Sequence, residues 1–136
     1  MLEKIVIGTA NFTQPYGVLS SENKPLDKAF VQSIMNAAQS AGIHTFDTAF
    51  GYGDFLSILP ADFSFKNSQI ITKFSALDSY DEVLNKLKVS HDEYGLVYKG
   101  LLIHDPQNLH RVDAKALCRF FESAKEKGYV KKIGIS

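Results

Sequence analysis

The sequence has a single cysteine and no excess of charge of either sign, and both shortages exclude classes of protein. Cys118 has no second thiol in the chain, so an internal disulfide is excluded and a reducing compartment is favoured. Lysine plus arginine equals aspartate plus glutamate at 15 each, which gives no electrostatic reason to expect nucleic acid or an anionic membrane as partner. Because cysteine packs readily as an apolar group, we expect Cys118 to be a small core residue of a helix rather than a nucleophile.

Long hydrophobic runs are also missing. The apolar stretch within residues 1–8 is too short for a signal peptide or a membrane span, so a cytoplasmic location is expected. The 136 residues are 45% apolar and 22% charged, which is typical of one soluble domain with a real core. No internal repeat, low-complexity segment or linker divides the chain. We therefore predict a single domain over residues 1–136.

Several familiar catalytic signatures are absent. Gly51-Tyr52-Gly53 stops short of the Gly-x-Gly-x-x-Gly fingerprint, which disfavours a Rossmann nucleotide site. The sequence contains no Walker loop, no His-Glu-x-x-His, no paired Cys-x-x-Cys and no Gly-x-Ser-x-Gly. The histidines outside the candidate site show no metal-ligand spacing, so no metal is expected.

What is present is an alternation of apolar β-branched runs and helical patterns. Loop residues are predicted between Asn11 and Pro25. The helix that follows is expected to bury Phe30, Ile34, Ala37 or Ala38, and Ala41. The segment 55–65 is only weakly helical. The expected strands are Ile5–Ala10, Ile43–Thr48, Gln69–Phe74, Lys99–Asp105 and Lys132–Ser136, and the expected helices are Leu26–Ala41, Ser79–Ser90 and Asp113–Lys127.

Strands that alternate with helices predict an α/β fold with a parallel sheet wound in one hand. A complete (β/α)₈ TIM barrel needs roughly 250 residues. The chain therefore corresponds to the first four βα units plus the start of a fifth strand, which is half of a barrel.

Four polar residues follow the predicted strands at their C-terminal ends: Asp47, Tyr52, Lys73 and His104. Taken singly, each has an ordinary interpretation as a loop cap, a packed aromatic, a solvated lysine or a turn histidine. In a parallel barrel, however, these ends converge on one rim, so the four are expected to meet there. Four such residues arriving in separate units are difficult to attribute to solubility.

The chemistry of this set suits the reduction of a carbonyl group. Hydride transfer to a carbonyl places negative charge on oxygen, and a nearby proton donor must neutralise it. A lysine ammonium close to Tyr52 favours the phenolate and makes the phenol a better acid, while Asp47 can pair with Lys73 and hold it in place. His104 would orient the carbonyl oxygen through a second hydrogen bond.

The stretch Gly42–Ala49 followed by Tyr52-Gly53 resembles the aldo-keto reductase signature, Gly-x-x-x-Phe-Asp-Thr-Ala and then Tyr-Gly. The runs Ile-Thr-Lys-Phe and Leu-Leu-Ile-His-Asp-Pro also look like strand motifs of that family. The sequence departs from the family after the loop, at residues 54–60, so the helix there is expected to be shortened or reshaped. The resemblance implies that Asp47, Tyr52, Lys73 and His104 are the catalytic tetrad of a reductase for an aldehyde or ketone, with Tyr52 as general acid.

The resemblance also implies a cofactor. Thr9, Ala10 and Asp47 would line the nicotinamide riboside end of NADPH, and Ser136 matches the serine that contacts the carboxamide. The phosphates of barrel cofactors are commonly held by loops after strands seven and eight, which this chain does not contain. We therefore expect the polypeptide alone to be a poor or inactive reductase that self-associates through open sheet edges.

The segment 11–17 resembles a loop of bacterial family members associated with sugar or cell-surface polysaccharide metabolism, which suggests a sugar-related carbonyl substrate. Four aromatic residues could wall a substrate pocket or pack in the core: Phe12, Tyr16, Phe50 and Phe55.

Two other functions stay open. The chain could be a non-catalytic half-barrel that keeps the tetrad by descent and serves as a binding or regulatory module. It could also be an unrelated barrel lyase or isomerase that uses Lys73 as a Schiff-base amine.

Overall fold

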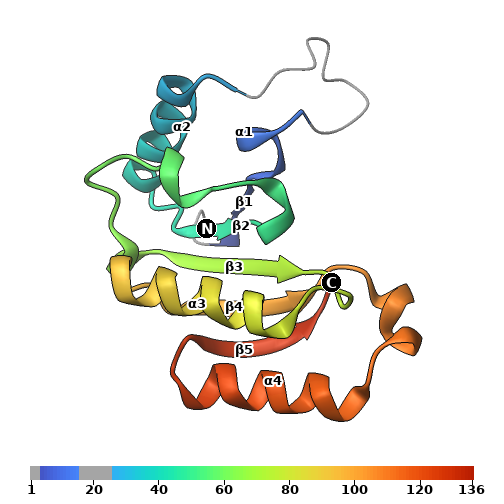
Figure 1. Ribbon diagram of the computed structural model, residues 1–136. Coiled ribbons are helices and arrows are strands. Elements are labelled where there is room, and N and C mark those ends of the chain that lie inside the picture. Colours follow the sequence, from blue (N-terminus) through green and yellow to red (C-terminus); the bar gives the residue numbers. More distant parts are fainter. Residues whose placement is uncertain (1–3, 16–25) are drawn as a thin grey trace. The chain divides into compact units, whose positions relative to one another are not determined.

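A computed structural model describes residues 4–15 and 26–136, which fall into two compact units (Figure 1). Unit 1 covers Met1–Gln69 and unit 2 covers Ile70–Ser136. Most of the expected loop Asn11–Pro25 lies outside the described residues, and so does Tyr16 of the expected aromatic pocket.

The predicted alternation of strands and helices is confirmed, with five strands and four α-helices among the described residues. The short helix at residues 10–13 was not expected. The 55–65 segment forms isolated 3₁₀ turns instead of an α-helix, in keeping with the departure from the family pattern there. The strands are β1 (Val6–Gly8), β2 (Thr45–Asp47), β3 (Gln69–Phe74), β4 (Tyr98–Ile103) and β5 (Val130–Ile135); the helices are α1 (Ala10–Thr13), α2 (Lys28–Ser40), α3 (Tyr80–Tyr94) and α4 (Ala114–Glu126); and the 3₁₀ turns are η2 (Phe50–Tyr52), η3 (Leu56–Ile58), η4 (Phe65–Asn67) and η5 (Pro106–Arg111).

In unit 1, β1 and β2 are parallel partners, and Gly8 lies opposite Asp47. The Thr9 amide extends this ladder by donating to the Asp47 carbonyl at 2.9 Å. Behind the strand, Phe46 is fully buried and meets Phe63 edge-on, with ring centroids 5.6 Å apart. This aromatic contact anchors the irregular 55–65 segment to the strand that ends in Asp47.

The buried face of α2 differs from the expected one. The helix begins after Asp27, whose carboxylate accepts the amides of Ala29 and Phe30. Its buried residues are Val31, Met35 and Ala38, whereas Phe30 is 55% exposed. Two apolar stripes with helical spacing run side by side in this sequence, one residue apart, so the period alone did not decide which of them faces the core.

In unit 2, β3, β4 and β5 form parallel pairs with Phe74, Ile103 and Ile135 in line across the strands. Figure 1 shows the three strands in order, with α3 and α4 running along them. The Phe74 ring packs against Phe120 and Phe121 of α4 at centroid distances of 5.2 and 5.9 Å. The side of the sheet that carries Phe74 therefore faces the helices.

Helix α4 confirms the expected inward face, because Leu117, Phe120, Phe121 and Ala124 are all buried. Cys118 is exposed, so the expectation that it is a core residue was wrong. The residue follows Leu117 directly, and consecutive helical positions are about 100° apart. The position therefore rotates the thiol out of the apolar stripe.

The edge strands are more exposed than a buried parallel strand should be. Val6 of β1 is 49% exposed, which corrects the expectation of a buried first strand. On β5, Ile133 and Ile135 are 42% and 58% exposed.

Neither α2 nor any other helix among residues 4–15 and 26–136 is long and apolar enough to cross a membrane.

Gly95 ends α3 in the left-handed conformation, with φ of +63°, and a Cβ atom there would meet nothing within 4 Å. We predict that Gly95→Ala lowers the free energy of unfolding by about 1 kcal/mol, because the only cost is backbone strain. Gly100→Ala is the matched control, since its Cβ would make an ordinary 3.5 Å contact without positive φ. Urea titration of both variants measures the difference, and equal stabilities would contradict the assignment.

Candidate active site

Unit 1 supplies the predicted acid and the predicted phenol. Asp47 is the last residue of β2 and is partly exposed, and its neighbour across the ladder is Gly8, which has no side chain to cover it. Tyr52 closes the 3₁₀ turn η2, where its amide donates to the Ala49 carbonyl at 3.0 Å. The acid and the phenol are therefore held on consecutive short elements of the same unit.

The Tyr52 loop is held by a contact with α1 that was not predicted from the sequence. The hydroxyl of Thr13, at the end of α1, donates to the backbone carbonyl of Tyr52. The next residue, Gly53, has φ of +94°, and a Cβ atom there would lie 3.2 Å from the Thr13 Cβ. Gly53 thus combines a left-handed backbone with a close approach, both of which exclude a side chain.

Unit 2 supplies the predicted lysine and histidine. In the β3–β4 register Lys73 lies opposite Leu102, and His104 follows Leu102 by two residues. The His104 amide continues the ladder past the end of β4 by donating to the Phe74 carbonyl at 2.9 Å. Side chains alternate between the two faces of a strand, so the positions of Lys73 and His104 fall on the same face, diagonal to one another. That face is opposite to the one that carries Phe74 and the helices.

Lys73 is only 5% exposed. Lysine is almost never buried to this extent unless it is paired, because removing an ammonium from water without a partner is costly. The ordinary interpretation of Lys73 as a solvated strand-end lysine is therefore wrong. His104, in contrast, is exposed, as a residue that meets a substrate should be.

Each unit contains two of the four predicted catalytic residues. Asp47 and Tyr52 belong to unit 1, whereas Lys73 and His104 belong to unit 2. That the four side chains meet at one point stays a prediction.

Sequence reasoning did not single out Asp105. Its carboxylate accepts the Asn108 side-chain amide, the Ala76 backbone amide and the Ser75 hydroxyl, each at 2.7 Å. Partial burial opposes the charged form of Asp105, but these hydrogen bonds outweigh it and hold the pKa of the carboxyl below its usual range. The only signal in the sequence was the Asp-Pro step that ends β4.

The residues predicted to hold the cofactor differ in accessibility. Thr9 is 1% exposed, and its hydroxyl has no hydrogen-bond partner among the described residues. A buried hydroxyl of this kind needs a partner, and a bound ligand could supply one. Ala10 and Asp47 are partly exposed, and Ser136 is exposed at the end of the ladder, where its amide donates to the Ile103 carbonyl at 2.9 Å. That these residues hold the nicotinamide end of a cofactor stays a prediction.

The expected aromatic pocket is only partly supported. Phe12 and Phe55 are 6% and 5% exposed, which favours core packing for both. Phe50 is partly exposed and could still contact a ligand.

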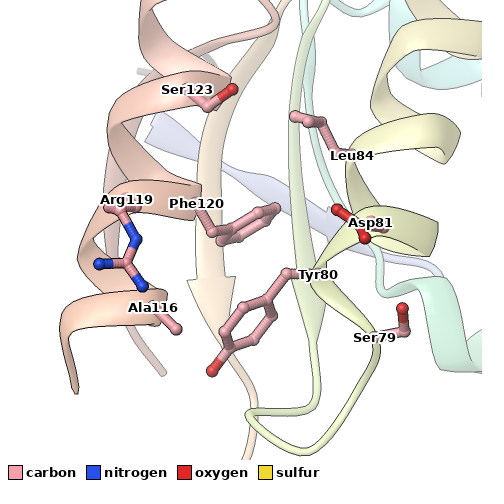
Figure 2. Close-up of a pocket in the computed structure, with 8 residues that line it drawn as sticks. All are labelled: Ser79, Tyr80, Asp81, Leu84, Ala116, Arg119, Phe120 and Ser123. Carbon is pink, nitrogen blue, oxygen red and sulfur yellow. The ribbon is translucent and has the colours of Figure 1, made fainter. Parts of the chain in front are cut away.

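A groove of about 430 Å³ lies elsewhere, between α3 and α4 in unit 2 (Figure 2). Its floor is the ring of Tyr80 stacked on Phe120 at a centroid distance of 5.1 Å, with Asp81 and Arg119 on opposite helices. Burial and then the negative charge of Asp113 raise the pKa of Tyr80, so this phenol stays protonated and is a weaker acid than a free tyrosine. None of the tetrad residues lines the groove.

Within residues 4–15 and 26–136, no three histidine, cysteine, aspartate or glutamate side chains gather in a way that could hold a metal ion.

The profile of the Aldo/keto reductase family matches residues 4–136. The chain belongs to the aldo/keto reductase family. Among curated proteins, none matches this aldo/keto reductase chain.

Solved aldo-keto reductase structures share the fold. A Pseudomonas aeruginosa protein assigned to the aldo-keto reductases matches with a TM-score of 0.74 at 20% identity, over 96% of this chain and 54% of its own. A thermostable aldo-keto reductase in complex with the inhibitor epalrestat matches with a TM-score of 0.66 at 17% identity, over 96% of this chain and 48% of its own. An aldo-keto reductase from a Medee basin deep-sea metagenome library gives 0.55 at 23% identity, over 85% and 47%.

This aldo/keto reductase chain therefore spans about half the length of the solved structures that it matches. Its α/β architecture, with parallel strands that alternate with helices, corresponds to half of the TIM barrel of those structures. The predicted family and fold class are both confirmed.

The close approach of Gly53 and Thr13 gives a test of how the Tyr52 loop is held. We predict that Gly53→Ala costs about 1–3 kcal/mol of unfolding free energy, because the new Cβ is both strained and crowded. Gly51→Ala, in the same loop, has no positive φ and no atom within 4 Å, and should be close to neutral. Urea unfolding followed by tyrosine fluorescence compares the two, and equal effects would show that the loop tolerates a side chain at both positions.

Proposed function

We propose that this chain is the N-terminal half of an NADPH-dependent oxidoreductase that reduces an aldehyde or ketone by hydride transfer. The observation that carries the proposal is the buried Lys73, which shares one face of the β3–β4 pair with His104 in a chain of this family. A lysine buried on the same strand face as a histidine is expected of a site that controls the acidity of a third group.

The proposed roles follow from the chemistry of each side chain. Tyr52 donates a proton to the oxygen that becomes negative as the carbonyl is reduced. Lys73 stabilises the phenolate that Tyr52 leaves behind, and Asp47 pairs with Lys73 and orients it. His104 hydrogen-bonds the carbonyl oxygen and aligns it for attack.

NADPH, when bound, supplies the hydride. Ala10 and Asp47 would meet its nicotinamide riboside, the buried Thr9 hydroxyl would gain a partner, and Ser136 would contact the carboxamide. Because the chain spans about half of its solved relatives, we propose that tight nucleotide binding and full activity need the phosphate-binding loops of the second half of a barrel.

The substrate class is proposed from the loop after β1. Its resemblance to loops of sugar-related family members suggests a polar, hydroxylated aldehyde or ketone. Of the expected pocket aromatics that the structure describes, Phe50 is the one exposed enough to contact it.

The test of the proposed chemistry is Tyr52→Phe, which removes one oxygen atom. We expect at least a 100-fold loss of NADPH-dependent carbonyl reduction, since a positioned general acid typically contributes 10²–10⁴-fold. The loss of nucleotide absorbance is followed with a panel of sugar aldehydes and simple ketones. Tyr94→Phe, on the exposed end of α3, is the matched control and should keep the parent activity.

An unimpaired Tyr52→Phe protein would remove the phenol from the mechanism. Covalent trapping of substrate on Lys73 by borohydride would instead indicate Schiff-base chemistry.

A second candidate function is favoured by the exposed isoleucines of β5. An edge strand with apolar side chains facing solvent is a surface on which another strand can pair. The chain would then act as a non-catalytic module that associates with a second copy of itself through this edge.

We predict that sedimentation of the parent chain shows concentration-dependent association and that Ile135→Lys shifts it toward monomer, because a charge on an edge strand opposes pairing. Val89→Lys is the matched control, since Val89 is 41% exposed on α3, away from β5. A parent chain that is monomeric at every concentration would contradict this candidate.

A further inference from the structure

Asp105 joins the ends of two neighbouring strands in unit 2. It follows β4 directly, and two of its three hydrogen-bond donors, the Ser75 hydroxyl and the Ala76 amide, lie in the loop that leaves β3. Both bonds are 2.7 Å long, which is in the range of strong charge-assisted hydrogen bonds. The carboxylate therefore links the two loops in addition to the strand ladder.

The β3 loop is shaped to present these donors. The Ser75 amide donates to the Asp78 carboxylate at 2.9 Å, and the Asp78 amide donates back to the Ser75 carbonyl at 3.0 Å. The Leu77 amide donates to the Ser75 hydroxyl oxygen at 3.2 Å, so the hydroxyl proton is left to point at Asp105. The turn thus fixes the direction of the bridge from the β3 side.

Ser75 and Asp105 lie close in the sequence to two predicted catalytic residues. Ser75 follows Lys73 by two positions, and Asp105 is the residue after His104. Lys73 and His104 share one face of the sheet, so a shift of one loop against the other would change the spacing of their side chains directly. Differences of about 1 Å at such a site can cost roughly 10²-fold in rate.

We propose that Asp105 is a positioning residue, which acts through Lys73 and His104 by locking the exits of β3 and β4 at a fixed spacing. The proposal rests on the function proposed above, because it assigns the purpose of the lock to the chemistry of those two side chains. Asp105 itself donates no proton and is not required to touch substrate or cofactor.

Asp105→Asn is the most informative variant, because asparagine has nearly the same size and shape as aspartate. All three partners of the carboxylate are donors, and an amide offers only one acceptor oxygen. The Ala76 amide is held by one carboxylate oxygen, and the Ser75 hydroxyl and the Asn108 amide share the other. The side chain of Asp105→Asn therefore turns its NH₂ group toward one of these two sides, and it removes the charge that strengthens all three bonds. Ser75→Ala removes the other bridge, and Asn108→Ala removes only the bond on the β4 side and is the matched control.

The first measurement is made by NMR on the chain itself and does not require activity. We expect hydrogen exchange of the Ala76 amide to become roughly tenfold faster in Asp105→Asn, as for the loss of a charge-assisted hydrogen bond. We also expect the Lys73 side-chain nitrogen and His104 ring signals to move in Asp105→Asn and Ser75→Ala but not in Asn108→Ala. Faster exchange with unmoved Lys73 and His104 signals would mean a purely structural role and would overturn the proposal.

The hydrogen bonds that the Asp105 carboxylate accepts should depend on pH. Protonation of Asp105 removes the charge that its partners stabilise, and its lowered pKa means that the bridge persists at neutral pH and is lost only as pH falls below the usual aspartate value of about 3.9. The Ala76 amide signal of the parent chain should therefore move in that acidic range, and this movement should vanish in Asp105→Asn. A shift centred above the usual value would contradict the bridge.

The second measurement separates the positioning role from the proposed reaction. In carbonyl reduction, Asp105→Asn should lower kcat roughly tenfold with little change in KM, because the reacting groups and not the substrate contacts are displaced. If neither the parent nor any variant reduces a carbonyl, the result fits the proposed need for the second half of a barrel, and the NMR signals of Lys73 and His104 still decide whether Asp105 positions them. Parent activity in Asp105→Asn would overturn the positioning role alone.

Discussion

The parallel pairing of β3 with β4 is the constraint on which the candidate site of unit 2 depends. Its register determines that Phe74 faces the helices and that Lys73 and His104 face the other way. A slip of one residue along β3 would exchange its two faces, placing an ammonium against the Phe120 and Phe121 rings. The aromatic packing of Phe74 therefore protects the register, and with it the placement of the polar pair.

Unit 1 also restrains a loop that carries a predicted catalytic residue, but its strands are shorter. Its strands have three residues each, too few to hold a loop firmly by themselves. The Tyr52 loop is instead held by the Thr13 hydroxyl and by the close approach of Gly53. Both units thus restrain the loops after their strands with a side-chain hydrogen bond, from the Thr13 hydroxyl in unit 1 and to the Asp105 carboxylate in unit 2, and unit 1 adds close packing at Gly53.

Much of this could be predicted from the sequence, for reasons that are local. The bounds of β3 were predicted correctly because a compact β-branched run lies between polar residues. The inward face of α4 was predicted correctly because its apolar stripe is unambiguous. The face of α2 was wrong because two stripes compete, and Cys118 was misplaced because burial of a single helical position depends on rotation by one residue. The Asp105 bridge could not be predicted, since it depends on where Ser75 and Ala76 lie relative to β4 in space. The same holds for Thr13, which meets Tyr52 across 39 positions of sequence.

The exposure of Cys118 has a practical consequence. The chain carries one thiol, and it lies on the outer surface of α4 beside a buried stripe that keeps the helix in place. Maleimide chemistry would therefore attach one reporter at one defined position without any change to the sequence. A fluorophore placed there would monitor how unit 2 behaves when other molecules or further polypeptide are added, while Lys73 and His104, on the opposite side of the strands, stay unmodified.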